Sequence, residues 1–254
     1  MNNTLVKGLS IIELLAHSER SLGLTEIAAA LDLAKSNVHR LLQALTEARY
    51  IVRDERNGRY MAAIKLWELG SAVLSKLDLR VHAAHVMDRL LTRTRETVHL
   101  TVLDGDEVVY VHKPDSPNPV RAYTQIGGRG RAHCVATGKA MLASLPPAAL
   151  ARMARSLKAH TPATIVEPPK FLQEMARIRV QGFAVNKGEW NENVCGIASP
   201  VTDVSGQVVA ALGLSGPKER FKQAQLKAFA PLIVEAAAQV SKSLGARDAL
   251  PAWR

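Results

Sequence analysis

The chain has 254 residues, of which 47% are apolar, so it has room for one large domain or two modest ones with a substantial core. Aromatic residues make up only 4%, which argues against a stacking platform for single-stranded nucleic acid. The formal net charge of +10 favours polyanionic partners, although basic and acidic residues are nearly balanced in the first 60 positions. Any argument for nucleic acid binding therefore rests on where the basic residues lie.

The N-terminal residues lack the basic-then-apolar order of a signal peptide, and no apolar run is long enough to span a membrane. The two cysteines, Cys134 and Cys195, are far apart in the sequence. Without a secretion signal we expect them to be reduced thiols rather than a disulfide. We therefore expect a cytoplasmic protein that makes no membrane contact.

Residues 1–62 predict a winged helix-turn-helix. A helix from Leu5 to His17 precedes a second helix, for which Thr25 occupies an N-cap position ahead of Glu26. A third helix runs from about Lys35 to Ala48. The positions expected to form a three-helix core are Leu5, Leu9, Ile12, Leu15 and Ala16 of the first helix and Val38, Leu41, Leu42 and Leu45 of the third.

Polar side chains occupy the outer face of the third helix, and their types are those that contact base edges and phosphates in the major groove. They are Lys35, Ser36, Asn37, His39, Arg40 and Gln43. Two short strands follow, at residues 50–52 and 60–62, around an Asn57-Gly58 turn signal. The arginines of this predicted wing, Arg53, Arg56 and Arg59, can lie along a phosphate backbone. The alternative for the two helices is an ordinary amphipathic hairpin with a solvated polar face. The alternative for the three wing arginines is a solvated charged turn.

A helix over residues 64–75 is expected to link the two domains, within a linker of residues 63–78. Its Trp67 either packs on the wing or forms a dimer contact. From residue 79 to the end, the pattern predicts an α+β domain with helices at both ends of a mostly antiparallel sheet. The predicted helices are 79–94, one from Ala136, 146–159, 168–181 and 221–244, and the predicted strands are 98–103, 107–112, 120–126, 183–187, 194–201 and 208–215.

Four segments in this order resemble the IclR family of bacterial transcriptional regulators, over nearly the whole chain. They are Val38-His39-Arg40-Leu41-Leu42, residues 129–143, residues 182–185 with 195–201, and residues 211–217. The resemblance implies an N-terminal winged helix-turn-helix and a C-terminal GAF-like effector-binding domain. It also implies a partner in double-stranded DNA, a small-molecule effector, and assembly as a homodimer or a dimer of dimers.

Carried over position by position, the resemblance places the effector pocket at Ala136, Thr137, Asn186, Cys195, Gly213 and Ser215. The residues alone point to the same place, because backbone N–H groups at a helix start after a Gly-rich loop form an anion site, which adds Gly138. The alternative to an anion site is an ordinary capped helix in the core. The alternative to a ligand contact for Cys195 is a small core residue.

The sequence departs from the family pattern at informative positions. Asn186 stands where an acidic residue is common, and Gly213 stands where Ser is common, which predicts a less acidic and roomier pocket. We therefore expect an organic acid larger than two or three carbons, such as an aromatic carboxylate. Arg131 replaces the usual Pro, and Arg49 replaces the Gly usual before the wing strand.

Thiol chemistry and metal binding are the two other kinds of function that these residues could support. The pair His133-Cys134 invites thiol chemistry, but neighbours on a strand point to opposite faces. Side chains that can bind metals occur at His82, His85, His99, His112, His133 and the two cysteines, without the close spacing of a specific metal motif. We therefore expect no catalytic residue, no cofactor and no metal site. The alternative is a metal- or thiol-dependent enzyme with an accessory DNA-binding domain.

Overall fold

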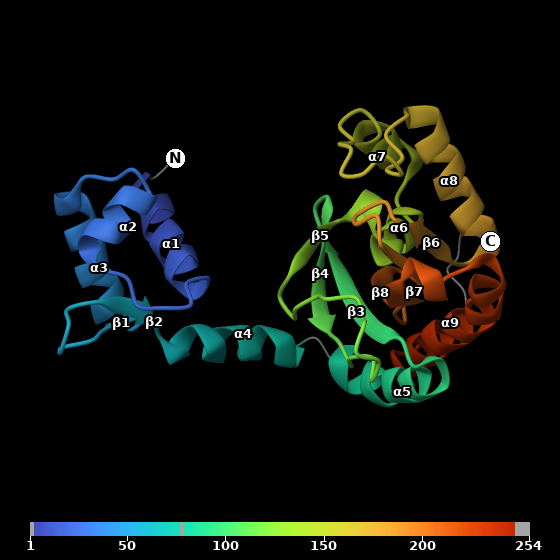
Figure 1. The fold of residues 1–254 in the computed structure, drawn as a ribbon, viewed down its shortest axis with the longest axis horizontal. Helices are drawn as coiled ribbons and strands as arrows, with labels where there is room; N and C mark the ends of the chain where they lie inside the picture. The colour runs from blue at the N-terminus through green and yellow to red at the C-terminus, as the bar shows by residue number, and fades with distance from the viewer. Residues whose placement is uncertain (1–2, 77–78, 247–254) are drawn as a thin grey trace. The chain divides into compact units, whose positions relative to one another are not determined.

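The computed structural model describes residues 3–76 and 79–246, and the chain divides into two compact units between Asp78 and Leu79 (Figure 1). The elements of the first unit are α1 (Asn3–Ala16), α2 (Leu24–Ala30), α3 (Lys35–Glu47), β1 (Ile51–Arg53), β2 (Tyr60–Ala62) and α4 (Ile64–Lys76). Helices α1 to α3 and the β1–β2 hairpin enclose one apolar core. The first unit is therefore a winged helix-turn-helix, as the sequence predicts.

Two details of the first unit differ from the sequence prediction. Helix α2 begins one residue before Thr25, with Gly23 as its N-cap, and the Glu26 carboxylate accepts the Gly23 N–H at 2.7 Å. In α1, Leu5 and Leu9 are exposed, whereas Ile11 and Leu15 are buried. Residues four apart share a helix face, and the face that includes Ile11 is the one that meets α3, where Leu41 lies beside Gly8.

The second unit is an α+β domain. Its strands are β3 (Thr97–Asp104), β4 (Glu107–His112), β5 (Arg129–Arg131), β6 (Ala184–Lys187), β7 (Val194–Thr202) and β8 (Val208–Pro217). They form a six-stranded sheet in the order β5-β4-β3-β8-β7-β6, antiparallel throughout. The helices are α5 (Leu79–Thr94), η1 (Ala132–Cys134), α6 (Ala136–Leu142), α7 (Pro147–Met153), α8 (Pro168–Gln181), η2 (Lys218–Arg220) and α9 (Gln223–Ser243).

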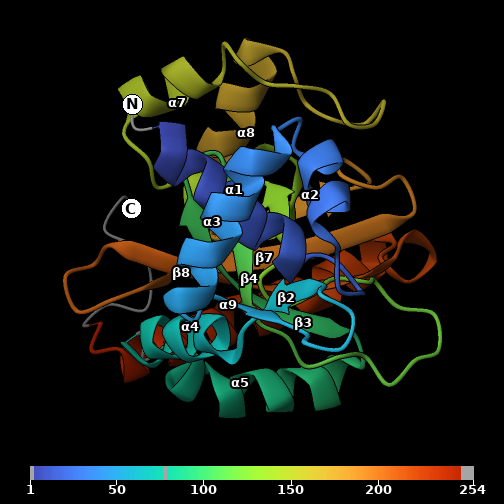
Figure 2. The same ribbon diagram turned by 90° about the vertical axis from the view of Figure 1, so that its left-hand side faces the viewer.

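The sheet of the second unit is covered by helices on both sides. Helices α5 and α9 pack together and against β3 and β7, while α6 packs against β7 and β8 with α8 behind it. Figures 1 and 2 both place α7 and α8 on one side of the strands and α5 on the other. Every residue of α6 is buried, so this short helix forms the centre of its layer.

Three segments of the second unit differ from their predicted structure. Residues 120–126 are not a strand: the segment is a loop, and β5 lies further on, at residues 129–131. The helix predicted over 146–159 ends at Met153, and residues 161–166, which the sequence predicts to be short and extended, have a bend and turn at 161–163 and form no strand. In the last case Thr161 and Thr164 hold a tight turn, in which the Thr164 N–H donates to the Thr161 carbonyl at 3.1 Å. None of the helices in the described residues is long and apolar enough to cross a membrane.

Candidate DNA interface and effector cavity

The outer face of α3 is open to solvent. Lys35, Ser36, His39, Arg40 and Gln43 are exposed and Asn37 is half-buried. Within the described residues, none of these side chains has a hydrogen bond or ion pair with the rest of the chain. The N-cap is Ala34, which has no side-chain acceptor for the first-turn N–H groups. The Asn37 N–H donates to the Ala34 carbonyl at 3.0 Å, so the N–H groups of Lys35 and Ser36, together with these side chains, are available to an external partner.

The wing loop between β1 and β2 is held by its own hydrogen bonds. The Asp54 carboxylate accepts from the Arg56 N–H at 2.9 Å and from the Asn57 amide at 2.7 Å. Gly58 takes a positive φ of 66°, which closes the turn. Arg53 and Arg56 are exposed, with Arg53 lying 5.9 Å from the centre of the Tyr60 ring. The loop thus presents two arginines on a fixed backbone.

Arg59, the third wing arginine, is directed back toward the helices. Its Nη2 lies 2.5 Å from the Glu26 carboxylate, and its Nε donates to the Ser21 carbonyl at 3.0 Å. The sequence grouped Arg59 with the phosphate contacts, but in the structure its guanidinium joins the wing to α2. Spacing along the loop could not reveal this difference, because Glu26 is far away in the sequence.

Arg49, which stands where the family has Gly, has a left-handed backbone with φ of 61°. Side chains other than Gly adopt this conformation at a cost of about 1–2 kcal/mol, because Cβ approaches the following carbonyl oxygen. Arg49 therefore has a backbone conformation that Gly would adopt without this cost. The Tyr50 N–H still donates to the Leu45 carbonyl at 2.9 Å, which closes the end of α3.

The second unit contains a cavity of about 510 Å³ between the sheet and α6. The register of the strands sets which residues form one wall of this cavity. Asn186 lies opposite Gly196, which lies opposite Ser215, and in the next row His99 lies opposite Gly213. Directly opposed residues share a sheet face, so these positions form one surface. Ala136 and Thr137 of α6 complete the wall.

Two of the predicted pocket residues do not line this cavity, namely Gly138 and Cys195. Cys195 alternates with Val194 and Gly196, which do line it, so the thiol points to the opposite face. A side chain on Gly138 would put its Cβ 2.2 Å from the Ala132 carbonyl oxygen. Gly138 is therefore required for close packing of α6 against η1.

The expectation that Gly213 leaves space for a ligand is corrected by its surroundings. A Cβ at this position would lie 2.6 Å from the Thr137 methyl group and 3.2 Å from the Ala198 side chain. The space that a larger residue would fill is already occupied by Thr137. Gly213 thus allows α6 to approach the sheet, and the cavity extends elsewhere, toward β4 and the loop of residues 120–124.

Neutral polar groups dominate the interior of the cavity. Ser215 Oγ lies 2.5 Å from His99 Nε2, and burial lowers the pKa of His99 to about 3, so the ring is uncharged at neutral pH. Burial also raises the pKa of Tyr110 to about 12. Asn186 Oδ1 accepts the Glu189 N–H at 2.8 Å, which assigns the amide orientation and leaves Nδ2 as a donor. Two exposed charged residues also line the cavity, the cation Arg121 and the anion Glu219.

Several cavity residues were missed at the sequence level. His99, Tyr110 and Trp190 line the cavity, as do the side chains of residues 120–124. The sequence shows His99 only as one of several dispersed histidines. It does not show which residue of a neighbouring strand lies opposite His99, so it gives no sign that His99 lines a cavity. The apolar and aromatic residues of 120–124 predicted a strand, and Tyr123 is instead 79% exposed beside the cavity.

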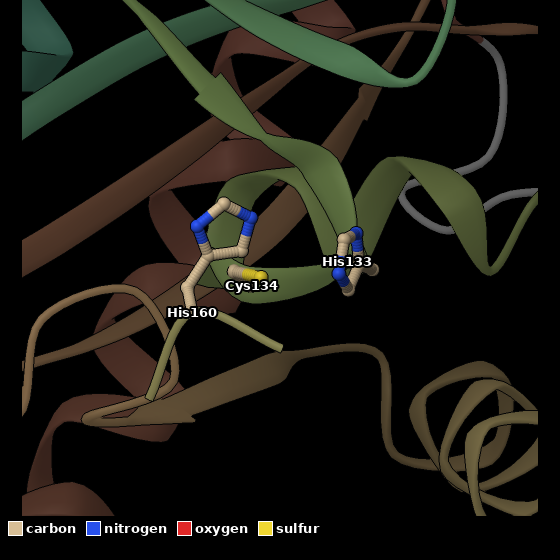
Figure 3. A group of neighbouring side chains, drawn as sticks. All are labelled: His133, Cys134 and His160. Carbon is tan, nitrogen blue, oxygen red and sulfur yellow. The ribbon is translucent and has the colours of Figure 1, made fainter. Parts of the chain in front are cut away.

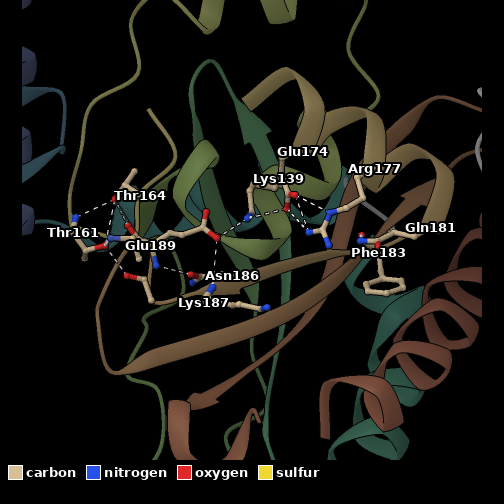
Figure 4. A network of polar contacts seen from close by, with 12 residues as sticks. Lys139, Thr161, Thr164, Glu174, Arg177, Gln181, Phe183, Asn186, Lys187 and Glu189 are labelled. Carbon is tan, nitrogen blue, oxygen red and sulfur yellow. Dashed lines mark hydrogen bonds and ion pairs between the residues drawn. The ribbon is translucent and has the colours of Figure 1, made fainter. Parts of the chain in front are cut away.

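A buried ion network supports the cavity wall from behind (Figure 4). Lys139 of α6 is fully buried, and its Nζ lies 2.6 Å from Glu189 and 3.4 Å from Glu174. Burial raises the pKa of Glu189 against the lowering effect of Lys139. Because the Glu189 N–H donates to Asn186, this network fixes the orientation of an amide in the cavity.

Neither cysteine has the environment of a nucleophile. Cys134 is buried, and burial raises the pKa of its thiol to about 12. Burial likewise raises the pKa of Cys195. The thiolate is the nucleophilic form, so neither thiol is activated as a free nucleophile at neutral pH. The segment containing His133 and Cys134 is a 3-10 helix rather than the strand assumed from the sequence.

A winged helix-turn-helix followed by a domain with a buried cavity defines a class, the DNA-binding transcriptional regulators. Residues 4–55 match the family described as "IclR helix-turn-helix domain", and residues 71–242 match "Bacterial transcriptional regulator IclR C-terminal". The chain therefore belongs to the IclR family, whose members regulate transcription and are not enzymes. The resemblance inferred from four sequence segments is thereby confirmed.

Known relatives are similar over almost their full lengths. The regulator KdgR of Escherichia coli (strain K12) is 32% identical over 249 residues, which are 97% of this chain and 94% of KdgR. The crystal structure of Thermotoga maritima IclR is 29% identical, with a TM-score of 0.80 over 96% of this chain and 100% of that one. A homologue from Microbacterium hydrocarbonoxydans, complexed with 4-hydroxybenzoate, has a TM-score of 0.84 at 23% identity, over 95% and 99% of the two chains.

Proposed function

We propose that this regulator binds a near-palindromic operator as a homodimer or a dimer of dimers, with the N-terminal half of α3 in the major groove. The exposed, unpaired polar face of α3 is the observation that carries the proposal. Arg40 is the side chain placed to contact a guanine edge, and the uncapped first turn is placed to contact a phosphate. Arg53 and Arg56 of the wing lie along the neighbouring backbone.

Footprinting on the promoter of the gene itself, followed by affinity measurements on the protected site and a scrambled duplex, tests this interface. Arg40→Ala should lose about 1–3 kcal/mol on the operator and much less on the scrambled DNA. Arg155→Ala is the matched control, since it removes an exposed arginine from the other unit. An unchanged ratio of operator to scrambled affinity in Arg40→Ala would refute base recognition by α3.

For the dimer contact we propose the exposed apolar surface of the first unit. Trp67 is 69% exposed and Ile64 is 71% exposed on α4, and Leu5 and Leu9 are exposed on α1. The alternative from the sequence, in which Trp67 packs on the wing, does not fit this exposure. Large exposed apolar groups mark association surfaces. Sedimentation of Trp67→Ser should show weaker dimerisation than Trp190→Phe, a control that changes a tryptophan of the second unit.

For the effector we propose a small organic acid with an aromatic body, bound in the 510 Å³ cavity. The carboxylate would accept from the first-turn N–H groups at Ala136 and Thr137 and from Asn186 Nδ2. The uncharged His99 and Tyr110 leave the interior free of fixed charge. The 4-hydroxybenzoate held by the Microbacterium homologue supports this ligand class.

Calorimetry on the full chain tests the effector with benzoate, benzamide and glyoxylate as probes. Benzoate should bind more tightly than either of the others, and Asn186→Asp should weaken benzoate at least tenfold because it places an anion beside the carboxylate. His85→Gln, an exposed position on α5, is the control. The bound acid should change operator affinity by about 1–3 kcal/mol. Preference for glyoxylate, or indifference to Asn186→Asp, would contradict the proposal.

A further inference from the structure

Three side chains that can bind a metal lie together outside the proposed effector cavity (Figure 3). His133 and Cys134 come from η1, and His160 comes from the segment between α7 and α8. One ligand atom of each residue lies within 4.8 Å of the other two. In the described part of the chain this is the one group of three such side chains that is brought so close. We call it the His133–Cys134–His160 cluster.

The imidazole of His133 is oriented as a metal ligand requires. Its Nε2 lies 2.9 Å from the Lys158 carbonyl oxygen, which can only accept, so Nε2 carries the proton. The lone pair is then on Nδ1, free for a metal ion. A histidine that ligates a metal commonly donates its other N–H to a carbonyl or carboxylate in this way.

The segment that carries His160 is held in place by two threonines. The His160 N–H donates to Thr164 Oγ1 at 3.1 Å, and the same hydroxyl donates to the Glu189 carbonyl at 2.7 Å. Thr161 Oγ1 donates to the Gly188 carbonyl at 2.7 Å. The His160 side chain is exposed while His133 and Cys134 are buried. The cluster is therefore anchored and also has a route for an ion from solvent.

A buried carboxylate, Glu189, lies next to the segment that carries His160, and its Oε1 is paired with Lys139 at 2.6 Å. Glu189 is 5% exposed, and its Oε2 has no hydrogen-bond partner among the described residues. Lys139 offsets the charge of this carboxylate, so the case for a metal ion rests on the three ligand side chains and their placement.

We propose that His133, Cys134 and His160 bind one zinc-class divalent cation, with water as the fourth ligand. Two imidazole nitrogens and one thiolate form a donor set that suits Zn²⁺, with bonds of roughly 2.0–2.3 Å and ligand atoms roughly 3.3–3.8 Å apart. The ligand atoms now lie within 4.8 Å of one another, so metal binding would require side-chain rotations in His133 or Cys134 as well as in the exposed His160. Binding forms the metal–sulfur bond and releases the Cys134 thiol proton to solvent.

The site adjoins the proposed effector cavity without being part of it. Val135 to Thr137, directly after Cys134, line the cavity, and the His160 ring lies 4.5 Å from the ring of Trp190, which also lines it. None of the three ligands lines the cavity itself. The metal would therefore fix the outer side of the cavity wall, and its binding is measurable without any effector.

Titration of the metal-free full-length chain with Co²⁺ and with Zn²⁺ tests the proposal. Co²⁺ should produce a thiolate-to-cobalt absorption band at one equivalent per chain, and Zn²⁺ should abolish the band. Cys134→Ser should remove the band, whereas Cys195→Ser should keep it, because that thiol lies elsewhere on the sheet. A missing band, or a band that survives Cys134→Ser, would overturn the site.

Because Cys134 is buried, Cys134→Ser could lose the band through misfolding, and a second variant distinguishes this case from loss of a ligand. His160→Ala alters an exposed side chain, and circular dichroism should match the parent protein. Calorimetry should show at least a tenfold loss of Zn²⁺ affinity in this variant and none in His85→Ala, a control at an exposed histidine. Equal affinities of His160→Ala and the parent would also overturn the proposal. Neither titration involves DNA or an organic acid, so failure here leaves the proposed regulatory function untouched.

Discussion

Arg59 of the wing and Glu26 of α2 form an ion pair, with Nη2 2.5 Å from Oε2, that joins two segments 33 residues apart. Glu26 also accepts the Gly23 N–H and the Arg20 guanidinium at 3.0 Å. One carboxylate thus caps α2 and anchors the wing. The wing arginines consequently divide into Arg59, which is paired within the fold, and two whose side chains are exposed, Arg53 and Arg56.

Arg59→Ala and Arg56→Ala should affect different properties. Arg59→Ala removes a partly exposed pair and a hydrogen bond, so it should lower the free energy of unfolding by about 1 kcal/mol. Arg56→Ala should leave stability unchanged but weaken binding to every DNA sequence and reduce the salt slope by about one. Urea titration and salt-dependent anisotropy measure the two effects. If Arg59→Ala reduced the salt slope of DNA binding by about one and left the free energy of unfolding unchanged, Arg59 would be a phosphate contact and the distinction between the two arginines would be wrong.

Arg49→Gly should stabilise the protein, because a left-handed residue without Cβ is relieved of steric strain. We expect a gain of about 1 kcal/mol in unfolding free energy. Ala48→Gly is the control, since Ala48 has a right-handed backbone and Gly there should be destabilising. Thermal unfolding of the two variants gives the sign directly. A lower melting temperature in Arg49→Gly would show that the Arg49 side chain makes a compensating contribution.

The close approach of Gly213 and Thr137 makes a prediction about two coupled substitutions. Gly213→Ala places a methyl group 2.6 Å from Thr137 Cγ2 and should cost about 1–3 kcal/mol. Thr137→Ser removes that Cγ2, so the double variant should recover much of the loss. A double-mutant cycle by urea unfolding measures the coupling. Simple additivity of the two changes would mean that Thr137 does not limit the space at Gly213.

The buried His99 should make stability depend on pH. Its pKa is about 3 in the folded chain and about 6.5 when unfolded, so between these values the unfolded state binds the extra proton. The free energy of unfolding should therefore fall by about 1.4 kcal/mol for each pH unit below 6.5, until about pH 3. His99→Gln should lose this part of the slope, and the exposed control His85→Gln should keep it. If the free energy of unfolding had the same pH slope in His99→Gln and His85→Gln, the pH dependence would not come from His99.

Local patterns in the sequence were sufficient for most of the architecture. The helical spacing over residues 35–48, the Asn57-Gly58 turn and the alternation of the strands predicted at 98–103 and 107–112 depend on neighbours within a few residues. The structure has each of them near the predicted place. Gly182 ends α8 with φ of 79°, as a glycine C-cap predicts. The polar face of α3 is likewise a property of the helix repeat itself.

The tertiary structure decided which side chains meet across long separations. Strand register placed His99 opposite Gly213 and aligned Asn186 with Ser215, while alternation turned Cys195 away from the cavity. Packing decided that Gly213 makes room for Thr137, and folding brought Arg59 to Glu26 and His160 to Cys134. Periodicity tells which face of an element is buried, but these contacts depend on register and chain path, which one sequence does not encode locally.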